Sequence, residues 1–339
     1  MFAGFKDFTE WVRPTLELAF RAHLSDLTND IVFKHGISFE SALAGGKMIR
    51  GCLLRLITDC LGGVPEAAIP RAVAVELIQA ASLLHDDFVD QDTVRRNQSA
   101  TWTLEGARRT VLLGDLIFAS AIKMMAELGR EDGSIISSAI VQVSRGAVQE
   151  HVDPLVLARE IESNRLDNGF YEKIVSLKTG NLFGAACRLG AIAAEADEPL
   201  KERSECYGLR IGEAYQIADD LQEMARIMKV RFVSAKLMVS IAPACLHFVE
   251  DARSHLSAAL RERNSLLSDE LFEYFKVAAV RMEAEIERRL RSALAEIDTY
   301  FPQNESGLLA RRAPWDLIRM FNANNHPRSE PELPDYCRF

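Results

Sequence analysis

The chain has 339 residues, of which 48% are hydrophobic, and this is enough to bury the core of one large domain or of two. Its formal net charge of -9 and its lack of any dense Lys/Arg run argue against a nucleic-acid partner, because nucleic acids attract basic stripes. The cysteines are scattered, with no CxxC pair and no short Cys/His spacing, which predicts reduced, intracellular and mostly buried thiols.

We expect no segment that targets the chain or spans a membrane. The opening MFAGFKDFTEWVRP includes Asp7 and Glu10 and lacks the basic stretch and apolar run of a signal peptide. No stretch of about 18 uncharged apolar residues occurs, so no transmembrane segment is predicted. These features favour a cytoplasmic protein.

Apolar residues recur at helical spacing along almost the whole chain, and alternating runs rich in Val, Ile and Thr are nearly absent. This pattern predicts an all-α fold. The predicted helices are Phe8–Asp30, Ile49–Leu61, Ile69–Asp90, Arg108–Leu128, Ile135–Gln149, Tyr171–Ala194, Lys201–Met228, Lys236–Glu262 and Glu270–Tyr300.

The chain is predicted to form a single domain. No internal repeat or low-complexity block divides it, and the Gly, Pro and Asn clusters between helices, such as LGGVPEAAIP, are short. We expect a helical domain over residues 1–322. The proline-rich end of the chain predicts an extended or disordered tail over residues 323–339.

An acidic cluster lies in the stretch LLHDDFVDQDTVRR. Asp86, Asp87 and Asp90 stand at i, i+1 and i+4, so on a helix Asp86 and Asp90 share a face and Asp87 flanks it. Mg²⁺ prefers such hard oxygen ligands and is commonly held by one or two carboxylates together with substrate phosphates.

The same spacing recurs once, in YQIADDLQE. The residues of this second triplet are Asp219, Asp220 and Glu223. A single acidic triplet is most often a solvated helix face. Two matched triplets, each on an otherwise apolar helix, instead predict divalent metal ions around a polyphosphate.

Basic residues are also spaced for anion binding. In GGKMIRG, Gly45 and Gly46 precede Lys47 and Arg50 at an expected helix start, where free backbone N–H groups favour phosphate. The segment is not a P-loop, because its glycine spacing differs. Further along, Arg95 and Arg96 follow the first triplet, and Lys178 lies beside Thr179 in SLKTGNLFG. Each alone would most often be a surface residue, but their joint order predicts a diphosphate site.

The sequence resembles the trans-isoprenyl diphosphate synthases. GGKMIR is similar to their GGKxxR, LLHDDFVDQDTVRR to their first aspartate-rich motif, GDLIFASA to GDxLxA, SLKTG to the KT pair and YQIADDLQE to FQxxDD. The matches follow in the family's order over roughly half of the chain. The resemblance implies a single-domain bundle of mostly antiparallel helices around a central cavity, acting as a homodimer or within a heteromer.

The resemblance also implies a role for each matched residue. The implied magnesium ligands, for about three ions per site, are Asp86, Asp87, Asp90, Asp219, Asp220 and Glu223. The implied substrate-binding residues are Arg95 and Lys178 for an allylic diphosphate and Lys47, Arg50, Gln79, Arg96 and Lys236 for isopentenyl diphosphate and its clamp. The implied catalytic set is Asp86, Asp87, Lys178, Thr179, Gln216 and Asp219, with Thr179 and Gln216 at the reacting end of the allyl chain.

The reaction implied is elongation. The allylic C–O bond ionises, the double bond of isopentenyl diphosphate attacks the cation, and a proton leaves to the departing diphosphate. Metal ions and basic residues would stabilise the leaving charge, while apolar walls would exclude water.

Two features depart from the family pattern. Glu223 stands where the second motif usually ends in Asp, which makes the carboxylate one methylene longer. The segment that follows, EMARIMKVRFVSAKLMVSIAPACLHF, contains no glycine, whereas the family usually has a GK loop and a DLxxGKxTLP-like segment. Lys229 is the candidate for the lysine of the GK loop, and Lys236 is the candidate for the lysine of the DLxxGKxTLP-like segment.

The residues one turn before Asp86 predict the product length. Ala81 and Ser82 are small where bulky aromatics block the chain tunnel in short-product relatives. The resemblance therefore implies a deep tunnel and a product of geranylgeranyl length or longer. The alternative is that small residues here only allow close helix packing.

Three functions remain open from the sequence. A prenyltransferase accounts for both the acidic motifs and the basic residues. A class I terpene cyclase shares the acidic motifs but needs no isopentenyl site, and the retained Lys47, Arg50 and Arg96 argue against it. A weakly active or regulatory partner subunit is favoured by the altered segment after Asp220. A di-iron bundle fits worst, because no Glu-x-x-His pair occurs.

Overall fold

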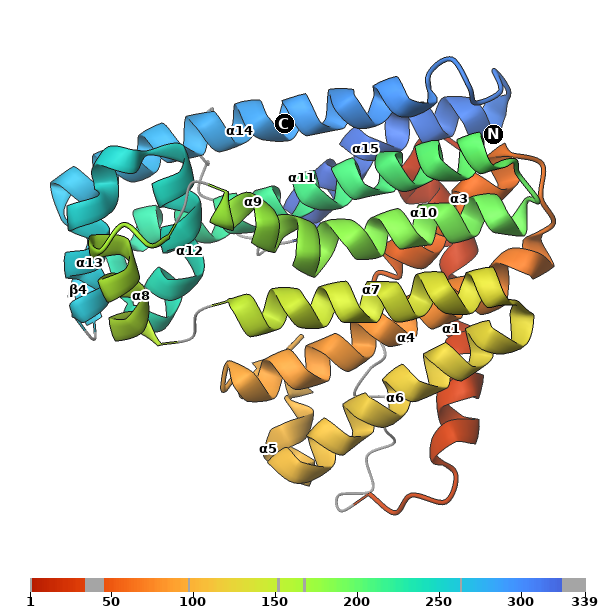
Figure 1. Cartoon of the computed structure of the whole chain (residues 1–339), viewed down its shortest axis with the longest axis horizontal. Helices are drawn as coiled ribbons and strands as arrows, with labels where there is room; N and C mark the ends of the chain where they lie inside the picture. The colour runs from red at the N-terminus through yellow and green to blue at the C-terminus, as the bar shows by residue number, and fades with distance from the viewer. Residues whose placement is uncertain are drawn as a thin grey trace.

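The computed structural model describes residues 2–33, 46–96, 98–150, 153–166, 169–262 and 264–324. Figure 1 confirms the all-α prediction. The helices are α1 (Phe5–Thr28), α3 (Ile49–Cys60), α4 (Pro65–Val89), α5 (Thr101–Glu105), α6 (Ala107–Leu128), α7 (Arg130–Gln149), α8 (Pro154–Glu162), α9 (Phe170–Val175), α10 (Asn181–Ala193), α11 (Glu198–Val230), α12 (Ala235–Phe248), α13 (Arg253–Arg261), α14 (Asp269–Ile297) and α15 (Glu305–Asn324).

Short irregular elements join these helices. A π-helical turn, Ser176–Gly180, links α9 to α10, and a 3-10 turn, Glu250–Ala252, links α12 to α13. The two antiparallel ribbons among the described residues are β1 (Val94–Arg95) with β2 (Gln98–Ser99), and β3 (Phe232–Ser234) with β4 (Asn264–Leu266). In their registers Val94 pairs with Ser99, and Phe232 pairs with Leu266.

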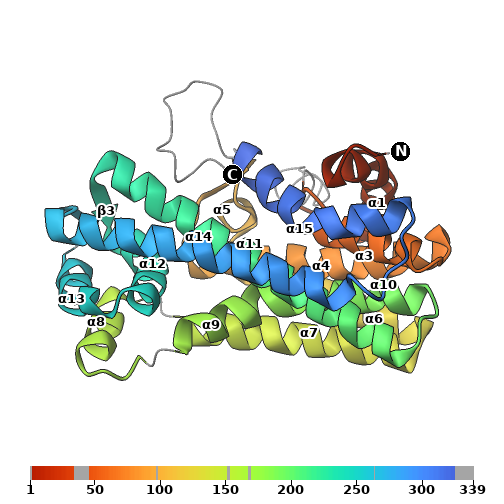
Figure 2. The same ribbon diagram turned by 90° about the horizontal axis from the view of Figure 1, so that it is seen from above.

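The long helices form a bundle with two hydrophobic cores. Helices α4, α6, α7, α10, α11 and α14 run side by side along the long axis (Figure 1). One core lies among α1, α3, α4, α6, α7, α10 and α15, and the second among α8, α9, α12, α13 and α14. Helix α11 passes from the first core, at Tyr207 and Ile211, into the second, at Ala214 and Ile217. Figure 2 shows α8, α12 and α13 at the end of the bundle opposite α1 and α3.

The structure corrects the predicted helices at several points. The single helix predicted over Lys236–Glu262 is wrong, because Val249 leaves the helical conformation (φ -141°) and separates α12 from α13. The helix predicted over Tyr171–Ala194 contains the π-helical turn. Helices α5, α8 and α15 were not predicted. The predicted tail lies largely outside the described residues, and α15 extends to Asn324.

Helix α4 carries the first acidic motif and is the most apolar long helix described. By length and composition this helix could cross a membrane. The prediction that no transmembrane segment occurs considered only stretches without charged residues, and α4 contains charged residues. However, 61% of its apolar window is buried inside the structure, where it packs against α3, α6 and α10. This burial accounts for its apolar character.

Glycines allow α11, which carries the second acidic motif, and α10 to pack closely against their neighbours. A Cβ atom added at Gly208 would collide with the carbonyl oxygen of Phe183 in α10 and would lie 2.7 Å from Cys187 Sγ. At Gly190, where α10 crosses α3, an added Cβ would lie 2.5 Å from the carbonyl oxygen of Leu54. The glycines therefore set the distance between these helix backbones.

We expect Gly208→Ala to destabilise the protein by about 1–3 kcal/mol, because the extra methyl group meets backbone atoms that cannot rotate away. Chemical denaturation monitored by circular dichroism measures this change. Gly129→Ala is the matched control, since its Cβ would make an ordinary contact of 3.4 Å with Asp132. Equal stability of the two variants would contradict the prediction.

Candidate active site

The two acidic motifs are electrostatically coupled through one lysine. The first motif ends α4, with Asp90 as its C-terminal cap, and the second lies within α11. Lys178, in the π-helical turn, interacts with Asp86 and Asp90 of the first motif and with Asp219 of the second. The fold thus brings the two triplets near one lysine, and their role as metal ligands stays a prediction.

Burial raises the pKa values of carboxyl groups in both motifs. The pKa of Asp86 is raised to about 6, with Lys178 opposing the shift and Asp90 and Glu150 adding to it. Burial also raises the pKa of Asp220, to about 7. The pKa of Asp219 is raised by burial and by the neighbouring Glu223. Crowded carboxylates of this kind favour cations among them.

Glu150, at the end of α7, joins this cluster and was missed in the sequence. Its carboxylate pairs with the ammonium group of Lys178, and its charge contributes to the raised pKa values of Asp86, Asp90 and Asp220. No motif marks Glu150, because only the packing of α7 against the π-helical turn brings it here.

Lys178 is therefore held between carboxylates. Burial lowers its pKa, but Glu150 and Asp86 outweigh this effect, and the net shift is upward. Helix α7 can approach this closely because Gly146 has no side chain, and a Cβ there would lie 2.7 Å from Lys178 Cγ. Such π-helical turns are frequent at functional sites.

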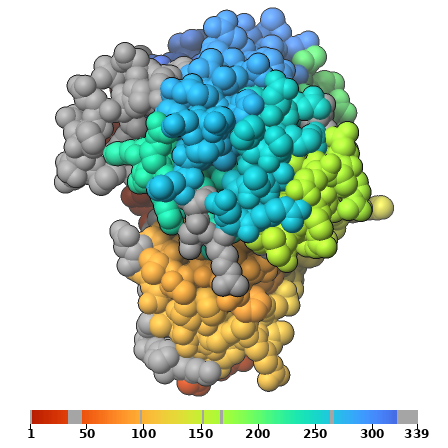
Figure 3. Space-filling model, turned by 90° about the vertical axis from the view of Figure 1, so that its left-hand side faces the viewer, coloured from red at the N-terminus to blue at the C-terminus, as the bar shows by residue number. Residues whose placement is uncertain are grey.

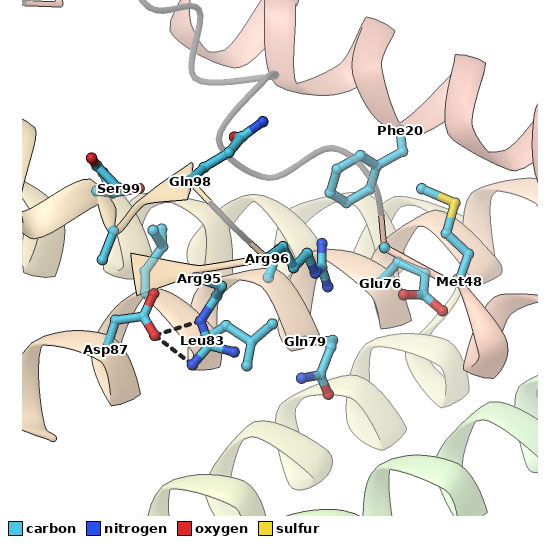
Figure 4. Close-up of a pocket in the computed structure, with 15 residues that line it drawn as sticks. Phe20, Met48, Glu76, Gln79, Leu83, Asp87, Arg95, Arg96, Gln98 and Ser99 are labelled. Atoms are coloured by element: carbon cyan, nitrogen blue, oxygen red, sulfur yellow. Dashed lines mark hydrogen bonds and ion pairs between the residues drawn. The ribbon is translucent and has the colours of Figure 1, made fainter. Parts of the chain in front are cut away.

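Asp87 lies apart from Asp86 and Asp90. It is buried, and its carboxylate pairs with the guanidinium group of Arg95 from the β1–β2 ribbon (Figure 4). The structure thus gives Asp87 the position of an anchor for Arg95. Its role as a metal ligand stays a prediction.

Two of the predicted basic residues, Arg95 and Arg96, line one pocket. It lies between α4, the β1–β2 ribbon and α1, and Figure 4 shows Arg96, Gln79, Glu76, Met48 and Phe20 around it. The pocket is partly open to solvent. Gly46 also lines it, whereas Gly45 lies outside the described residues.

Arg50 and Lys47 complete this basic region. The guanidinium group of Arg50 stacks on the ring of Phe183 at 4.5 Å, and its buried Nε atom has no hydrogen-bond partner. Burial lowers the pKa of Lys47, and Asp219 on one side and Arg96 on the other act on it in opposite directions. Lys47 therefore lies between the second acidic motif and the pocket.

Glu76 is a second residue that was not predicted. It is buried, its carboxylate accepts a hydrogen bond of 2.8 Å from the backbone N–H of Gly51, and it interacts with Arg50 and Arg96. Burial raises its pKa, which these hydrogen bonds and charges oppose. A lone Glu in the apolar run VAVELIQAA was the available signal, since such a charge needs a partner when buried.

Thr179, Gln216 and Asp220 form a chain of hydrogen bonds. Thr179 Oγ1 donates to Gln216 Oε1 at 2.6 Å, and Gln216 Nε2 donates to Asp220 Oδ1 at 3.0 Å. Tyr171, from α9, donates its hydroxyl group to Asp220 Oδ2 at 2.6 Å. Tyr171 was not predicted, because nothing in the sequence relates α9 to α11.

The remaining predicted residues lie near the cavity. Asp219 is exposed, and Glu223 pairs with Arg226 at 3.2 Å. Lys236 donates to the carbonyl oxygen of Asp90 at 2.5 Å and pairs with Asp92, so it contacts the loop after the first motif. Figure 3 views this end of the molecule, with α12 and α13 in cyan above the orange end of α4.

The two residues predicted to set product length differ in burial. Ala81 is fully buried, and Ser82 is half-buried and donates from its hydroxyl group to the carbonyl oxygen of Gln79 at 3.0 Å. Ser82 precedes Asp86 by four residues and shares its helix face.

The donor set fits hard cations that keep other ligands. Within the described parts of the chain, no three His, Cys, Asp or Glu side chains gather closely enough to hold a metal ion by themselves. Mg²⁺ usually takes only one or two carboxylates and fills its remaining positions with water and phosphate oxygens. Oxygen donors that face each other across a cavity suit that pattern.

Residues 36–229, more than half of the chain, match the profile of the family described as polyprenyl synthetase. The chain belongs to the polyprenyl synthetase family. The resemblance found in the sequence is therefore confirmed.

Family members from archaea are among the similar proteins. A geranylfarnesyl diphosphate synthase of Aeropyrum pernix is 35% identical over 198 residues, which cover 55% of this chain and 60% of that protein. A short chain isoprenyl diphosphate synthase of Methanothermobacter thermautotrophicus is 28% identical over 319 residues, covering 84% and 94% of the two chains. The match to the first of these relatives thus spans less than two thirds of its length.

Among solved structures, the polyprenyl synthase of Caulobacter crescentus, complexed with calcium and isoprenyl diphosphate, has the same fold. Its TM-score is 0.70 at 22% identity, over 94% of this chain and 98% of that one. The family's fold is therefore present over nearly the whole chain.

Proposed function

We propose that the protein is a prenyltransferase that elongates an allylic diphosphate with isopentenyl diphosphate. One observation carries this proposal, namely that two anion-binding regions adjoin each other. The first surrounds Lys178, which interacts with both acidic motifs. The second is the pocket of Arg95 and Arg96, beside which the buried Nε of Arg50 lacks a partner. Condensation of two diphosphates needs two such regions, whereas a cyclase needs only one.

Magnesium is the cofactor that we propose for the first region. The carboxylates that would hold it are Asp86 and Asp90 on α4 and Asp219 and Glu223 on α11, all of them oxygen donors. When bound, Mg²⁺ would neutralise the charge that develops on the leaving diphosphate.

The chain's own residues would position the two substrates. Lys178 would exchange its contact with Glu150 for the allylic diphosphate, and the ion pair with Asp87 would orient Arg95 toward it. Arg50, Lys47 and Arg96 would bind the second diphosphate. Because the Arg50 guanidinium is desolvated, its attraction for phosphate would exceed that of a surface arginine.

The reacting carbons would lie near Thr179 and Gln216, at the level of the acidic motifs. The hydroxyl and amide oxygens would stabilise positive charge on the allylic carbon, and apolar side chains such as Phe183 would exclude water. The departing diphosphate would accept the proton that is lost from the new chain.

Turnover of defined substrates tests the proposal. With Mg²⁺ and isopentenyl diphosphate, the wild type should convert dimethylallyl, geranyl, farnesyl or geranylgeranyl diphosphate into longer prenyl diphosphates. Asp86→Ala should lower kcat by about 10²–10³-fold or more, because it removes a cavity-facing carboxylate, and should leave the far-ultraviolet circular dichroism unchanged. Hydrocarbon formed without isopentenyl diphosphate would indicate a cyclase. The absence of turnover with every substrate would favour a partner subunit instead.

We propose a product of geranylgeranyl length or longer, because Ala81 and Ser82, one turn before Asp86, have small side chains. Ala81→Phe should shorten the product, since an aromatic ring there would fill the path of the growing chain. Thin-layer analysis of radiolabelled products measures the length, and Ser82→Ala is the control in which the residue stays small. Unchanged lengths in both Ala81→Phe and Ser82→Phe would refute the tunnel assignment.

We propose that two copies of the chain associate through α6 and α7. These neighbouring helices expose apolar side chains, among them Leu112 (54% exposed), Ile122 (36%), Val141 (49%) and Val148 (85%). Burying them against the same face of a second copy would remove that apolar surface from water.

Val141→Glu should therefore convert a dimer into monomers, as measured by light scattering after gel filtration. Val280→Glu, an equally apolar and exposed position on α14 (58% exposed), should leave the dimer intact. A monomeric wild type at micromolar concentration would contradict the proposal.

A further inference from the structure

The hydrogen-bond chain around Asp220 uses both oxygens of its carboxylate. Oδ1 accepts from the amide of Gln216 at 3.0 Å, and Oδ2 accepts from the hydroxyl of Tyr171 at 2.6 Å. The side chain of the preceding residue, Asp219, reaches solvent. Two adjacent acids of one motif thus differ in what their oxygens contact.

We propose that Asp220 is a positioning residue that fixes the side-chain amide of Gln216, and that Tyr171 fixes Asp220. This inference rests on the proposed prenyltransferase function, because Gln216 is assigned there to the reacting end of the allyl chain. It assigns Asp220 a role different from that of a magnesium ligand.

The donor and acceptor properties of the groups determine the direction of the chain. In the structure Gln216 turns its NH₂ group toward Asp220, whose two oxygens accept from Gln216 and from Tyr171. The side-chain carbonyl oxygen of Gln216 then points the other way and accepts from Thr179 at 2.6 Å. Reversing the amide would place its oxygen against Asp220 Oδ1, and this repulsion holds the amide in one orientation.

Packing from four helices fixes the Tyr171 hydroxyl. The Tyr171 ring contacts the rings of His247 and Phe248 at the end of α12, with centroids 5.4 and 5.9 Å away. The next residue, Glu172, accepts a hydrogen bond of 3.0 Å from Arg289 of α14, and Arg289 also pairs with the buried Glu213 of α11. Helix α9 is thus tied to α11, α12 and α14, which leaves the hydroxyl little freedom to move.

The involvement of α12 connects this chain to the part of the sequence that departs from the family pattern. His247 and Phe248 end the glycine-free segment that follows the second motif. The segment therefore contacts the active site indirectly, through the ring of Tyr171. Through His247 and Phe248, the segment acts on the orientation of the Tyr171 hydroxyl group.

The decisive variants are Tyr171→Phe and Asp220→Asn, with Asp219→Asn as the matched control in the same motif. Tyr171→Phe removes only the hydroxyl and keeps the ring that packs on α12. We expect it to lower kcat about 10–100-fold, the usual effect of losing a group that orients an active-site side chain. The KM values for both diphosphates and the Mg²⁺ concentration for half-maximal rate should stay within about twofold of the wild type.

Asp220→Asn should behave in the same way, and the double variant should be no slower than Asp220→Asn alone, because both changes break one chain. A wild-type kcat in Tyr171→Phe, or additive losses in the double variant, would overturn the proposal. Thermal unfolding followed by circular dichroism checks that each variant is folded.

A binding measurement separates this inference from the proposed function. Calorimetric titration with inorganic pyrophosphate in the presence of Mg²⁺ needs no turnover. We expect Asp220→Asn and Tyr171→Phe to bind like the wild type and Asp219→Asn to bind more weakly. If Asp220→Asn weakens binding as much as Asp219→Asn, Asp220 is a metal ligand and the inference is wrong. If the wild type binds pyrophosphate but elongates no prenyl diphosphate, the proposed function fails, while the comparison of the two asparagine variants still stands.

Discussion

The site depends on the cost of keeping several carboxylates together in one partly dry cavity. Acidic side chains from α4, the end of α7 and α11 act on one another there, and burial raises the pKa values of Asp86, Asp90 and Asp220. Lys178 is the described cation that interacts with both acidic motifs and with Glu150. Other basic neighbours, such as Arg95 and Lys236, also act on these carboxylates, but the carboxyl pKa values stay raised. The arrangement therefore favours additional cations, and cations in turn favour a phosphate ligand.

The rest of the fold keeps these charges in place. Arg289 of α14 pairs with Glu213 of α11, with Glu285 one turn before it at 2.6 Å, and with Glu172 of α9. Because Arg289 and Glu213 are buried, removing either would leave an uncompensated charge in the core. The network therefore specifies how α9 and α11 meet. That meeting determines where Tyr171 lies relative to Asp220.

The sequence predicted those parts of the site whose residues lie close together along the chain. The helical faces of Asp86 with Asp90 and of Asp219 with Glu223 follow from spacing within one helix, which the sequence contains. The grouping of Lys47 and Arg50 with Arg96 required the family resemblance, because Arg96 follows β1 whereas the other two lie at the start of α3. Glu150 and Tyr171 escaped both kinds of reasoning, since tertiary packing alone brings them to Lys178 and Asp220.

The helices themselves show the same limit. Strong periodicity predicted α1, α6, α11 and α14 to within a few residues. It could not separate α12 from α13, because the apolar pattern continues through Val249 while the backbone leaves the helix there. It also missed α8, although Asp153 caps that helix by accepting hydrogen bonds from the backbone N–H groups of Leu155 and Val156 at 2.8 and 3.1 Å.

For the segment after the second motif, the structure leads to a different interpretation from the sequence. Its lack of the family's glycine and lysine pattern suggested a weakened diphosphate clamp. In the structure Lys236 instead contacts Asp90 and Asp92 at the end of α4, and the end of α12 packs on Tyr171. The segment thus touches both acidic motifs, the first through a charge and the second through an aromatic ring. A change in its sequence would therefore alter the surroundings of Asp90 through Lys236 and those of Asp220 through Tyr171.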